Sequence, residues 1–384
     1  MTSVDSKGRQ PVAGDPSGKK IALVTSSMDG GGAQRAVAKL ASGFAARGHH
    51  VDLVLAHARG PYLRELPPEV HVVDLGVPRL AVAVIPLARY LRRARPDVVF
   101  SALDYVNVVA VVARAVARVD IPLVVSERNT VSVAVAHTTS RRTRWMPRLI
   151  RWAYPRADAV VAVSQGVADD LVAECGLPAG TVHVLNNPVV TPEVVRMRSE
   201  EVEHPWLRDR TVPVVLAVGR LVPQKNFSSL LEAFAMARRS GPARLVILGQ
   251  GSLHPVLEEQ AERLGIADDV SLPGFSANPY PAMAAADVFV LSSRWEGSPG
   301  VLIEAMSSGT PVVATDCPSG PRQILDGGRY GRLVPVEDTA ALADALVDAI
   351  AGRVAPPPPE SWAPYTQDVV VEDYLELLLA GRGR

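Results

Sequence analysis

The sequence predicts an α/β protein with two domains, each built on a doubly wound parallel sheet. Short runs of β-branched residues alternate with longer amphipathic segments along most of the 384 residues. The runs are apolar on both faces, which is typical of parallel strands covered by helices on both sides. The alternation is interrupted once near the middle and then starts again. The chain is also about twice as long as a usual domain of ~100 to 200 residues, which agrees with two domains.

The first series of elements follows a polar N-terminal segment. Residues 1–18 contain Gly, Pro, Ser and charged residues without periodicity, which predicts a mobile tail. Strands are then predicted, in order, at residues 21–26, 51–56, 70–75, 98–102, 123–126, 159–164 and 182–185. Helices are predicted between them at residues 33–47, 85–93, 107–119 and 165–175. Strands that are joined by helices run parallel, so this series predicts the first sheet.

The second series follows a segment that contains prolines and charges but no apolar run. Its strands are predicted at residues 214–218, 245–248, 270–272, 288–292, 312–315 and 332–334, and its helices at 228–239, 254–264, 301–308 and 340–351. Four consecutive prolines then predict a stiff extended spacer. A final helix, at about residues 367–380, is expected to return across the interdomain region. The predicted divisions are a tail (1–18), a first domain (19–188), a linker (189–212), a second domain (213–355) and a C-terminal spacer and helix (356–384).

Composition excludes several classes of protein. Forty lysines and arginines balance forty aspartates and glutamates, so the chain has no net charge of the kind that collects nucleic acid onto a whole domain. Two cysteines, Cys175 and Cys317, can form neither a disulfide framework nor a four-thiolate zinc site. No apolar stretch approaches the ~20 residues of a membrane-spanning helix. We therefore expect a cytoplasmic protein with, at most, peripheral membrane contact.

A glycine-rich loop, DGGGAQR at residues 29–35, lies between the first predicted strand and the first helix. Glycines such as Gly31 and Gly32 let backbone amides approach an anion, and the helix N-terminus adds unpaired N–H groups. The spacing differs from the G-x-G-x-x-G pattern of dinucleotide-binding proteins. The loop thus predicts an anion site, although a tight turn alone would also explain it.

Arg220 and Lys225 lie on the loop that follows the first strand of the second domain, in the run GRLVPQKN. A guanidinium and an ammonium at this spacing could neutralise a diphosphate from two sides. An isolated arginine and lysine in a loop are more often simply solvated. Lys225, however, is the only lysine after Lys39 in a chain that otherwise uses arginine, which favours a functional role.

Glu296 and Glu304 lie eight residues apart, in the loop and first helical turn that follow the fourth strand of the second domain. Gly300 shapes the start of this helix, whose amides near Val301 and Leu302 suit a phosphate. The two carboxylates could therefore contact different parts of one ligand. An acidic helix cap would explain Glu296 alone, but not the whole set.

These motifs, taken in order, resemble those of the retaining glycosyltransferases of family four. The resemblance spans about residues 19–380 and includes the glycine-rich loop with Arg35, GRxxxxKN at 219–226, the pair Glu296 and Glu304, and GTPVVA at 309–314. SERN at 126–129 and DCPSGP at 316–321 are similar to a subgroup that acts on surface polysaccharides, lipid-linked oligosaccharides and some natural products. The resemblance implies two Rossmann-like domains that face each other across a cleft, an architecture called GT-B.

The resemblance also implies roles for the residues that match its motifs. Arg220 and Lys225 would hold the diphosphate of a nucleotide sugar, by family habit a UDP-sugar, while Glu304 would bind the ribose and Glu296 the sugar. Many members carry a histidine that faces the donor sugar where this chain has Glu127. Because of this difference the histidine's role does not carry over directly to Glu127. The predicted catalytic residues are Glu296, Glu127, Arg220 and Lys225, and the predicted donor-binding residues are Gly31, Gly32, Arg220, Lys225, Glu296, Gly300, Val301, Leu302 and Glu304.

No metal or other cofactor is expected. The chain contains no D-x-D triplet, and its eight histidines show no paired ligand spacing. A Mg²⁺ or Mn²⁺ ion bridging the diphosphate is therefore not predicted. Cationic side chains and a helix N-terminus would stabilise the departing diphosphate instead, and the nucleotide sugar is a substrate.

Three carboxylates are predicted where the acceptor should bind. Asp29, Asp104 and Glu127 each fall at the carboxyl end of a predicted strand of the first domain. Together they would suit a small soluble acceptor with an amino group, such as an amino sugar or aminocyclitol natural product. Each could instead serve only as a helix cap.

A basic segment leaves a second class of acceptor open. Residues 128–157 contain no acidic residue, and between residues 141 and 156 six arginines lie among tryptophans and aliphatic residues, namely Arg141, Arg142, Arg144, Arg148, Arg151 and Arg156. Such a segment suits an anionic membrane face, and hence a lipid-linked or cell-surface polysaccharide acceptor. Pro147 interrupts the pattern and favours an ordinary helix that packs in the core. The sequence therefore favours the soluble acceptor slightly.

Two other functions remain as alternatives. A nucleotide-sugar 2-epimerase would need the same donor site but no acceptor. A binding protein without turnover would keep only the affinity for the nucleotide sugar, although the paired glutamates argue against it.

Overall fold

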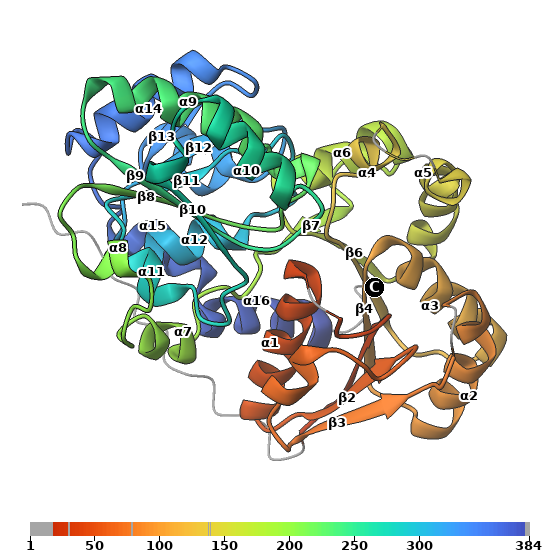
Figure 1. Cartoon of the computed structure of the whole chain (residues 1–384). Coiled ribbons are helices and arrows are strands. Elements are labelled where there is room, and N and C mark those ends of the chain that lie inside the picture. Colours follow the sequence, from red (N-terminus) through yellow and green to blue (C-terminus); the bar gives the residue numbers. More distant parts are fainter. Residues whose placement is uncertain (1–17, 30, 78–79, 137, 139, 381–384) are drawn as a thin grey trace, which may run out of the picture.

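The computed structural model describes residues 18–29, 31–77, 80–136, 138 and 140–380. Two parallel sheets are present, and each is covered by helices on both faces (Figure 1). The predicted fold class, two doubly wound α/β domains, is confirmed. The predicted mobile tail lies outside the described residues, apart from Gly18.

The first sheet has seven strands in the order β3-β2-β1-β4-β5-β6-β7. Every pairing is parallel, as the helical connections require. The strand order reverses between β1 and β4, and ligands of such sheets bind at the carboxyl ends of the strands beside this point. The strands are β1 (Lys20–Thr25), β2 (His50–Leu55), β3 (Val70–Asp74), β4 (Val98–Ala102), β5 (Leu123–Glu127), β6 (Ala159–Ala162) and β7 (Val182–Val184).

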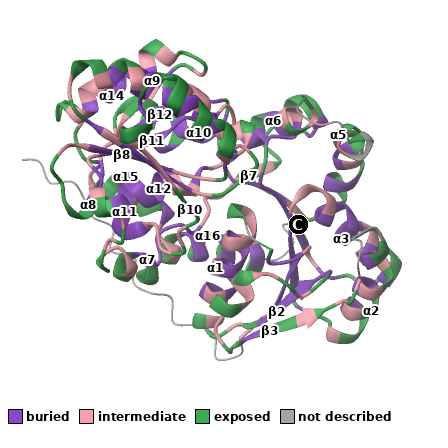
Figure 2. Ribbon diagram, in the orientation of Figure 1, coloured by how far each residue is buried: buried purple, intermediate pink, exposed green. Residues whose placement is uncertain are grey.

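Two layers of helices enclose the first sheet. The helices are α1 (Gly32–Ala46), α2 (Val84–Ala94), α3 (Asp104–Ala117), α4 (Val131–Ala136), α5 (Arg141–Ala153), α6 (Gln165–Cys175) and, from the end of the chain, α16 (Gln367–Leu379). α1 and α16 pack on one face, in a core that contains Phe44, Phe100 and Tyr374. α2, α3, α5 and α6 pack on the other face. Figure 2 shows the buried strands between these layers.

The second sheet has six parallel strands in the order β10-β9-β8-β11-β12-β13. They are β8 (Val214–Val218), β9 (Arg244–Leu248), β10 (Val270–Gly274), β11 (Val288–Leu291), β12 (Val312–Thr315) and β13 (Arg332–Val334). One face is covered by α9 (Phe227–Ala237), α10 (His254–Arg263) and α14 (Thr339–Ile350). The other face is covered by shorter helices, namely α7 (Pro192–Met197), α8 (Pro205–Arg208), α11 (Tyr280–Ala285), α12 (Gly300–Ser307), α13 (Pro321–Ile324) and α15 (Pro359–Trp362).

Short helices were the elements that periodicity did not predict. α7 and α8 lie inside the predicted linker, and α15 begins at the last residue of the four prolines, which shortens the predicted extended spacer. These helices have four to six residues, fewer than two turns, so they cannot display a helical repeat. Proline occupies the first turn of each, where its missing N–H costs no hydrogen bond.

The chain crosses between the two sheets twice, and the crossings lie side by side. The N–H groups of Val189 and Val190 both donate to the Tyr365 carbonyl, and the Gln367 N–H donates to the Val190 carbonyl. After the second crossing, α16 packs against α1. A Cβ atom on Gly43 of α1 would lie 2.4 Å from a Val371 methyl group, so only glycine permits this close approach.

Candidate active site

Lys225 and Glu296 meet between two loops of the second domain. A short 3₁₀ helix, η4 (Pro223–Lys225), ends at Lys225, whose Nζ lies 2.5 Å from Glu296 Oε1. The same oxygen accepts a hydrogen bond from Ser293 Oγ at 2.7 Å. Only 14% of the Lys225 side chain and 9% of the Glu296 side chain are exposed. The structure therefore brings together the ammonium and one of the carboxylates that the sequence singled out.

Arg220 lies on the same loop but outside this contact. Its side chain is exposed, and no hydrogen bond or ion pair joins its guanidinium to another residue in the described part of the chain. The Lys225 side chain instead runs over Gly219, where a Cβ atom would lie 3.3 Å from Lys225 Cε. The two predicted diphosphate ligands are thus neighbours along the loop without touching.

The start of α12 differs in one detail from the prediction. Pro299 precedes the helix, and no side chain caps it. The Leu302 N–H donates to the Pro299 carbonyl at 3.1 Å, so this amide is already used within the turn. The amides of Gly300 and Val301 come earlier in the turn, where a helix supplies no acceptor of its own. Of the two residues whose amides were predicted to bind a phosphate, Val301 therefore retains an amide suited to that role, and the Gly300 amide precedes it.

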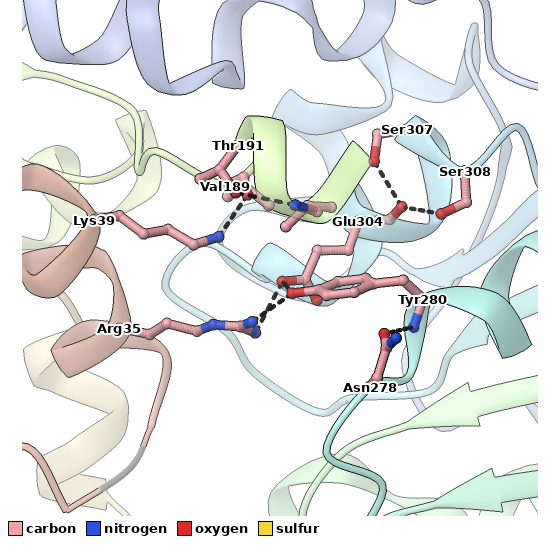
Figure 3. Close-up of polar contacts among 10 residues, drawn as sticks. Arg35, Lys39, Val189, Thr191, Asn278, Tyr280, Glu304, Ser307 and Ser308 are labelled. Carbon is pink, nitrogen blue, oxygen red and sulfur yellow. Dashed lines mark hydrogen bonds and ion pairs between the residues drawn. The ribbon is translucent and has the colours of Figure 1, made fainter. Parts of the chain in front are cut away.

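Glu304 contacts a cation from the other domain (Figure 3). Arg35 Nη1, on α1, lies 3.3 Å from Glu304 Oε1. Arg35 Nη2 lies 2.5 Å from the Tyr280 hydroxyl oxygen, which is itself 3.3 Å from the same glutamate oxygen. Only 10% of the Glu304 side chain is exposed. The glycine-rich-loop arginine and the second carboxylate, identified separately in the sequence, therefore form one cluster.

Tyr280 is a site residue that the sequence analysis missed. It begins the six-residue α11, where no periodic pattern or motif marks it. Its ring centre lies 5.7 Å from the Arg35 guanidinium carbon, within the range of a cation–π contact. Burial, followed by the negative charge of Glu304, raises the pKa of its hydroxyl, so the group stays protonated and can donate a hydrogen bond.

Lys39 fastens α1 to the first crossing between the sheets. Its Nζ donates to the Val189 carbonyl at 2.6 Å, one turn along the helix from Arg35 (Figure 3). Gln367, at the second crossing, donates to the Lys39 carbonyl at 2.8 Å. Burial lowers the pKa of Lys39 to about 8. Both crossings are therefore tied to the helix that carries Arg35.

The loop that holds Glu296 rests directly on the first domain. Thr130 Oγ1 donates to the Glu296 carbonyl at 3.2 Å, and Ser164 Oγ donates to the Gly297 carbonyl at 2.8 Å. A Cβ atom on Gly297 would lie 2.3 Å from the Arg128 carbonyl oxygen. Glycine at this position is therefore what allows the two domains to meet here.

The glycine-rich loop is described in part. Gly30 lies outside the described residues. Gly31 has a φ of 128°, a conformation that favours glycine, and it stands at the N-cap position of α1. Gly31 and Gly32 are both exposed, at the end of the helix that carries Arg35. Their approach to a donor stays a prediction.

Glu127 is buried in the first domain, with 1% of its surface exposed. The Tyr154 hydroxyl donates to Oε2 at 2.7 Å, and the N–H groups of Arg128 and Asn129 donate to Oε1 at 2.9 and 3.2 Å. Burial, followed by the nearby charge of Asp104, raises the pKa of Glu127 to about 8. In this conformation both carboxyl oxygens of Glu127 already have hydrogen-bond partners within the first domain.

The other two predicted acceptor carboxylates also have local partners. Asp29 accepts hydrogen bonds from Ser27 Oγ at 2.8 Å and from Arg59 Nε at 2.9 Å. The Ser27 hydrogen bond, together with Arg59, lowers the pKa of Asp29. Asp104 begins α3 and accepts from the Tyr105 N–H at 2.5 Å. The three carboxylates lie at the ends of neighbouring strands, but they do not form an unoccupied cluster.

Arg128 is a second residue whose burial the sequence did not reveal. Only 4% of it is exposed, and its Nη1 donates to Asn187 Oδ1. Its Nε and Nη2 atoms are buried and have no hydrogen-bond partner among the described residues. Its guanidinium carbon lies 5.8 Å from the centre of the Phe100 ring. A buried cation with donors to spare therefore lies at the carboxyl end of β5, beside the Glu296 loop.

Other features of the described residues bear on the possible chemistry. Cys175 and Cys317 are buried and unbridged. Within the described ranges, no three histidine, cysteine, aspartate or glutamate side chains gather as a metal site would require. No helix in those ranges has both the length and the apolar character needed to cross a membrane.

Each half of the chain matches the description of a known family. Residues 30–192 match "Glycosyltransferase Family 4" and residues 212–351 match "Glycosyl transferases group 1". A Campylobacter jejuni protein, N-acetylgalactosamine-N,N'-diacetylbacillosaminyl-diphospho-undecaprenol 4-alpha-N-acetylgalactosaminyltransferase, is 29% identical over 85% of this chain and 89% of its own length. The alpha-D-kanosaminyltransferase of Streptomyces kanamyceticus is 31% identical over 55% of this chain and 56% of its own length.

Solved structures share the arrangement of the two domains. The crystal structure of HepE from Anabaena, in complex with UDP and glucose, aligns with a TM-score of 0.77 over 94% of this chain and 100% of that protein, at 22% identity. The galactosyltransferase WaaB aligns with a TM-score of 0.71 over 94% of this chain and 99% of its own. At these identities the similarity establishes the fold, and the two family matches add the class of enzyme.

Proposed function

This chain is a glycosyltransferase similar to family four, with the GT-B fold, and from that premise we propose that it transfers a sugar from a nucleotide diphosphate sugar to an acceptor hydroxyl group with retention of configuration. The buried contact between Lys225 and Glu296 carries the proposal. A buried ion pair stabilises a fold poorly, because the cost of desolvating both charges offsets their attraction. Such a pair on two loops at strand ends is better explained by a ligand that both groups contact.

The proposed donor is a UDP-sugar. Lys225 would neutralise charge that develops on the leaving diphosphate, and the exposed Arg220 would contact it from the same loop. The amides of Gly300 and Val301 would add hydrogen bonds to a phosphate. HepE, whose fold this chain shares, was solved with UDP and with UDP-glucose, which supports the choice of nucleotide.

The proposed roles of the two glutamates follow from their surroundings. Glu296 would orient the donor sugar beside Lys225. Glu304 would bind the ribose hydroxyls. Arg35 contacts this carboxylate from the first domain, and Tyr280 contacts it from the second. Because Arg35 and the ribose would use the same carboxylate, we expect the Arg35 contact to rearrange when a donor binds. We further propose that the reaction needs no metal ion, since Lys225 and Arg220 supply the positive charge.

The donor chemistry can be tested without knowing the acceptor. Slow hydrolysis of a series of nucleotide sugars, followed by ¹H NMR in the presence of EDTA, should show consumption of one UDP-sugar and release of a sugar with the donor's anomeric configuration. An inverted product, or turnover only after Mg²⁺ is added, would contradict the proposal. Conversion of the donor alone into a C2 epimer would identify the epimerase alternative instead.

A soluble acceptor with an amino group is the first candidate for the second substrate. The kanosaminyltransferase similarity supports it, and Asp29 and Asp104 lie at the carboxyl edge of the first sheet. The geometry of Glu127 weakens it, because both carboxyl oxygens are already engaged. Transfer to aminocyclitols in a lipid-free assay would establish this candidate.

A lipid-linked or cell-surface acceptor is the second candidate. It is supported by the outer face of α5, where tryptophans and arginines are exposed together. It is also supported by the Campylobacter relative, whose name includes a diphospho-undecaprenol acceptor. The exposed face of α5 makes no core contacts and is free to meet a membrane, whereas the Glu127 carboxyl group is already engaged within the first domain. The geometry therefore favours the second candidate.

A further inference from the structure

Helix α5 has two faces of different chemistry. Met146, Ile150 and Ala153 are buried in the core of the first domain, with at most 2% of each exposed. The opposite face is exposed and consists of arginine and tryptophan, namely Arg144, Trp145, Arg148, Arg151 and Trp152, with Arg156 following in the next turn. The predicted ordinary helix and the predicted basic surface are therefore both present, on opposite sides of one element. The side chains of Arg141 and Arg142 lie outside the described set.

The two tryptophans on this face are unusually exposed. Trp145 is 58% exposed and Trp152 is 46% exposed. They are seven residues apart, so they project from the same side of the helix. Each is covered by an arginine: Arg148 Cζ lies 4.7 Å from the Trp145 ring centre and Arg156 Cζ lies 4.6 Å from that of Trp152. Exposed indole rings beside guanidinium groups are typical of surfaces that enter the interface of a bilayer.

The charge of the face is not cancelled by neighbouring acids along the chain. Residues 128–157 contain no aspartate or glutamate, and the next acid, Asp158, forms an ion pair with Arg114. Arg156 also lines a surface hollow of about 410 Å³, together with Arg114, Arg118 and one acid, Asp120. Because Arg114 is paired with Asp158 and Asp120 lies in the same hollow, the uncancelled positive charge is concentrated on the α5 face itself.

The position of α5 connects this face with the proposed chemistry. The chain reaches α5 through α4 after leaving the carboxyl end of β5, the edge of the sheet where the Glu296 loop rests on Thr130. Figure 1 shows α5 at the periphery of the first domain, away from the helices of the second domain. In the view of Figure 1, a flat membrane surface could therefore contact the α5 face without first contacting the second domain.

We propose that the exposed Arg–Trp face of α5 docks the enzyme on an anionic phospholipid membrane. The arginines supply attraction to acidic headgroups, and the two indole rings enter the interfacial region. This docking goes beyond the transfer reaction and does not depend on it, because donor hydrolysis needs no membrane. It would place a membrane-borne acceptor near the carboxyl edge of the first sheet.

Co-sedimentation of the full chain with vesicles tests the proposal. Binding is expected to vesicles of phosphatidylglycerol mixed with phosphatidylcholine, to be weak with phosphatidylcholine alone, and to fall as salt screens the charges. The double variant Arg144→Gln/Arg148→Gln should weaken binding about 30-fold, at about fivefold for each arginine near an anionic surface. The double variant Trp145→Ser/Trp152→Ser should also weaken it, with less dependence on salt.

A matched control removes the same charge elsewhere. Arg239 and Arg263 are exposed residues of the second domain, and Arg239→Gln/Arg263→Gln should bind vesicles like the wild type. All variants should keep the wild-type melting temperature and donor hydrolysis, because the substituted side chains are exposed. The proposal is overturned if the wild type does not bind anionic vesicles, or if the control pair loses as much binding as the α5 pairs. Retention on heparin without vesicle binding would equally overturn it, since that identifies a general polyanion surface.

Discussion

Lys225 and Glu296 are buried side by side, and the fold alone does not require the desolvation cost of burying these two charges. Their charges attract, but each loses hydration that apolar side chains would not have had to lose. The same arrangement suits a diphosphate, because an ammonium held by its own carboxylate partner is already oriented before the ligand arrives. We therefore read the pair as a preorganised part of the donor site.

Removal of this positive charge should act mainly on the donor. Lys225→Ala is expected to lower kcat/KM for the nucleotide sugar by a factor of order ~10² or more, and Arg220→Ala should have an effect of similar order, because each substitution removes charge from the site of the leaving group. Steady-state kinetics of donor hydrolysis, which need no acceptor, would measure both effects. Arg239→Ala, which removes an exposed arginine of the same domain, is the control. Kinetics close to wild type in Lys225→Ala would show that the loop does not hold the diphosphate.

Glu127 should make stability depend on pH. Its folded-state pKa of about 8 lies above the ordinary glutamate value of 4.5, so the folded protein holds this proton more tightly than the unfolded chain does. The stabilising contribution is complete below about pH 4.5 and is lost as the pH rises through about 8. Glu127→Gln, which cannot ionise, should therefore flatten the decline in unfolding free energy between these limits. Urea titrations at several pH values measure it, and an unchanged pH profile in the variant would mean that Glu127 is ionised in the folded state.

At the level of elements, most strands and long helices could be predicted because their apolar residues are periodic. The helix at 165–175, for example, was predicted with the observed ends, Gln165–Cys175. Elements such as α11 could not be predicted, because six residues are too few to show a repeat. Tyr280 was missed for the same reason, since it becomes a site residue only where α11 meets Arg35 and Glu304.

Gly297 limits how closely the donor loop can approach the first domain. A Cβ atom there would lie 2.3 Å from the Arg128 carbonyl oxygen, a distance at which backbone must move. Gly297→Ala is expected to displace the Glu296 loop and lower kcat several-fold or more, with a smaller effect on the melting temperature. Gly241→Ala is the matched control, because a Cβ atom at that position meets nothing within 4 Å. Equal kinetics for the two variants would show that contact between the loop and the first domain does not matter for turnover.

α16 should contribute strongly to the stability of the first domain, although it lies at the end of the chain. Tyr374 is fully buried and meets Phe100 edge to face, with ring centres 5.5 Å apart. Tyr374→Ala is expected to lower the free energy of unfolding by ~3 to 5 kcal/mol, as for other large aromatic side chains removed from a core. Glu376→Ala, on the exposed side of the same helix, should change it by less than ~0.5 kcal/mol. Thermal or urea unfolding measures both, and equal stabilities would mean that α16 is not part of this core.

At the scale of the whole molecule, the sequence contained the motifs but not their contacts. The order of the glycine-rich loop, the GRxxxxKN run and the two glutamates was enough to predict the kind of enzyme and the pairing of two domains. The contact between Arg35 and Glu304 joins residues 269 positions apart, and no local pattern encodes such a distance. The burial of Glu127 could not be predicted either. A carboxylate at the end of a strand has the same sequence pattern whether it faces solvent or contacts the Tyr154 hydroxyl.

The two domains are joined in a way that allows the donor site to respond to its ligand. The two crossings are hydrogen-bonded to each other at Val190 and Gln367. Lys39 of α1 is hydrogen-bonded to both crossings. Arg35, one turn away on the same helix, contacts the proposed ribose-binding carboxylate. We therefore expect that a donor bound at Glu304, as proposed, would be coupled to the position of the first domain through Arg35.

The most direct test of the donor site is a comparison of UDP and UMP binding by titration calorimetry in EDTA, for the wild type and for Lys225→Ala. The wild type should bind UDP more tightly than UMP by a factor of order ~10² or less, since the second phosphate would meet Lys225 and a charge-assisted hydrogen bond contributes ~1.5 to 3 kcal/mol. Lys225→Ala should lose most of this preference while keeping its affinity for UMP. If the wild type binds the two nucleotides equally, binds UDP only with Mg²⁺, or keeps its preference after the substitution, the site assigned here does not hold the diphosphate.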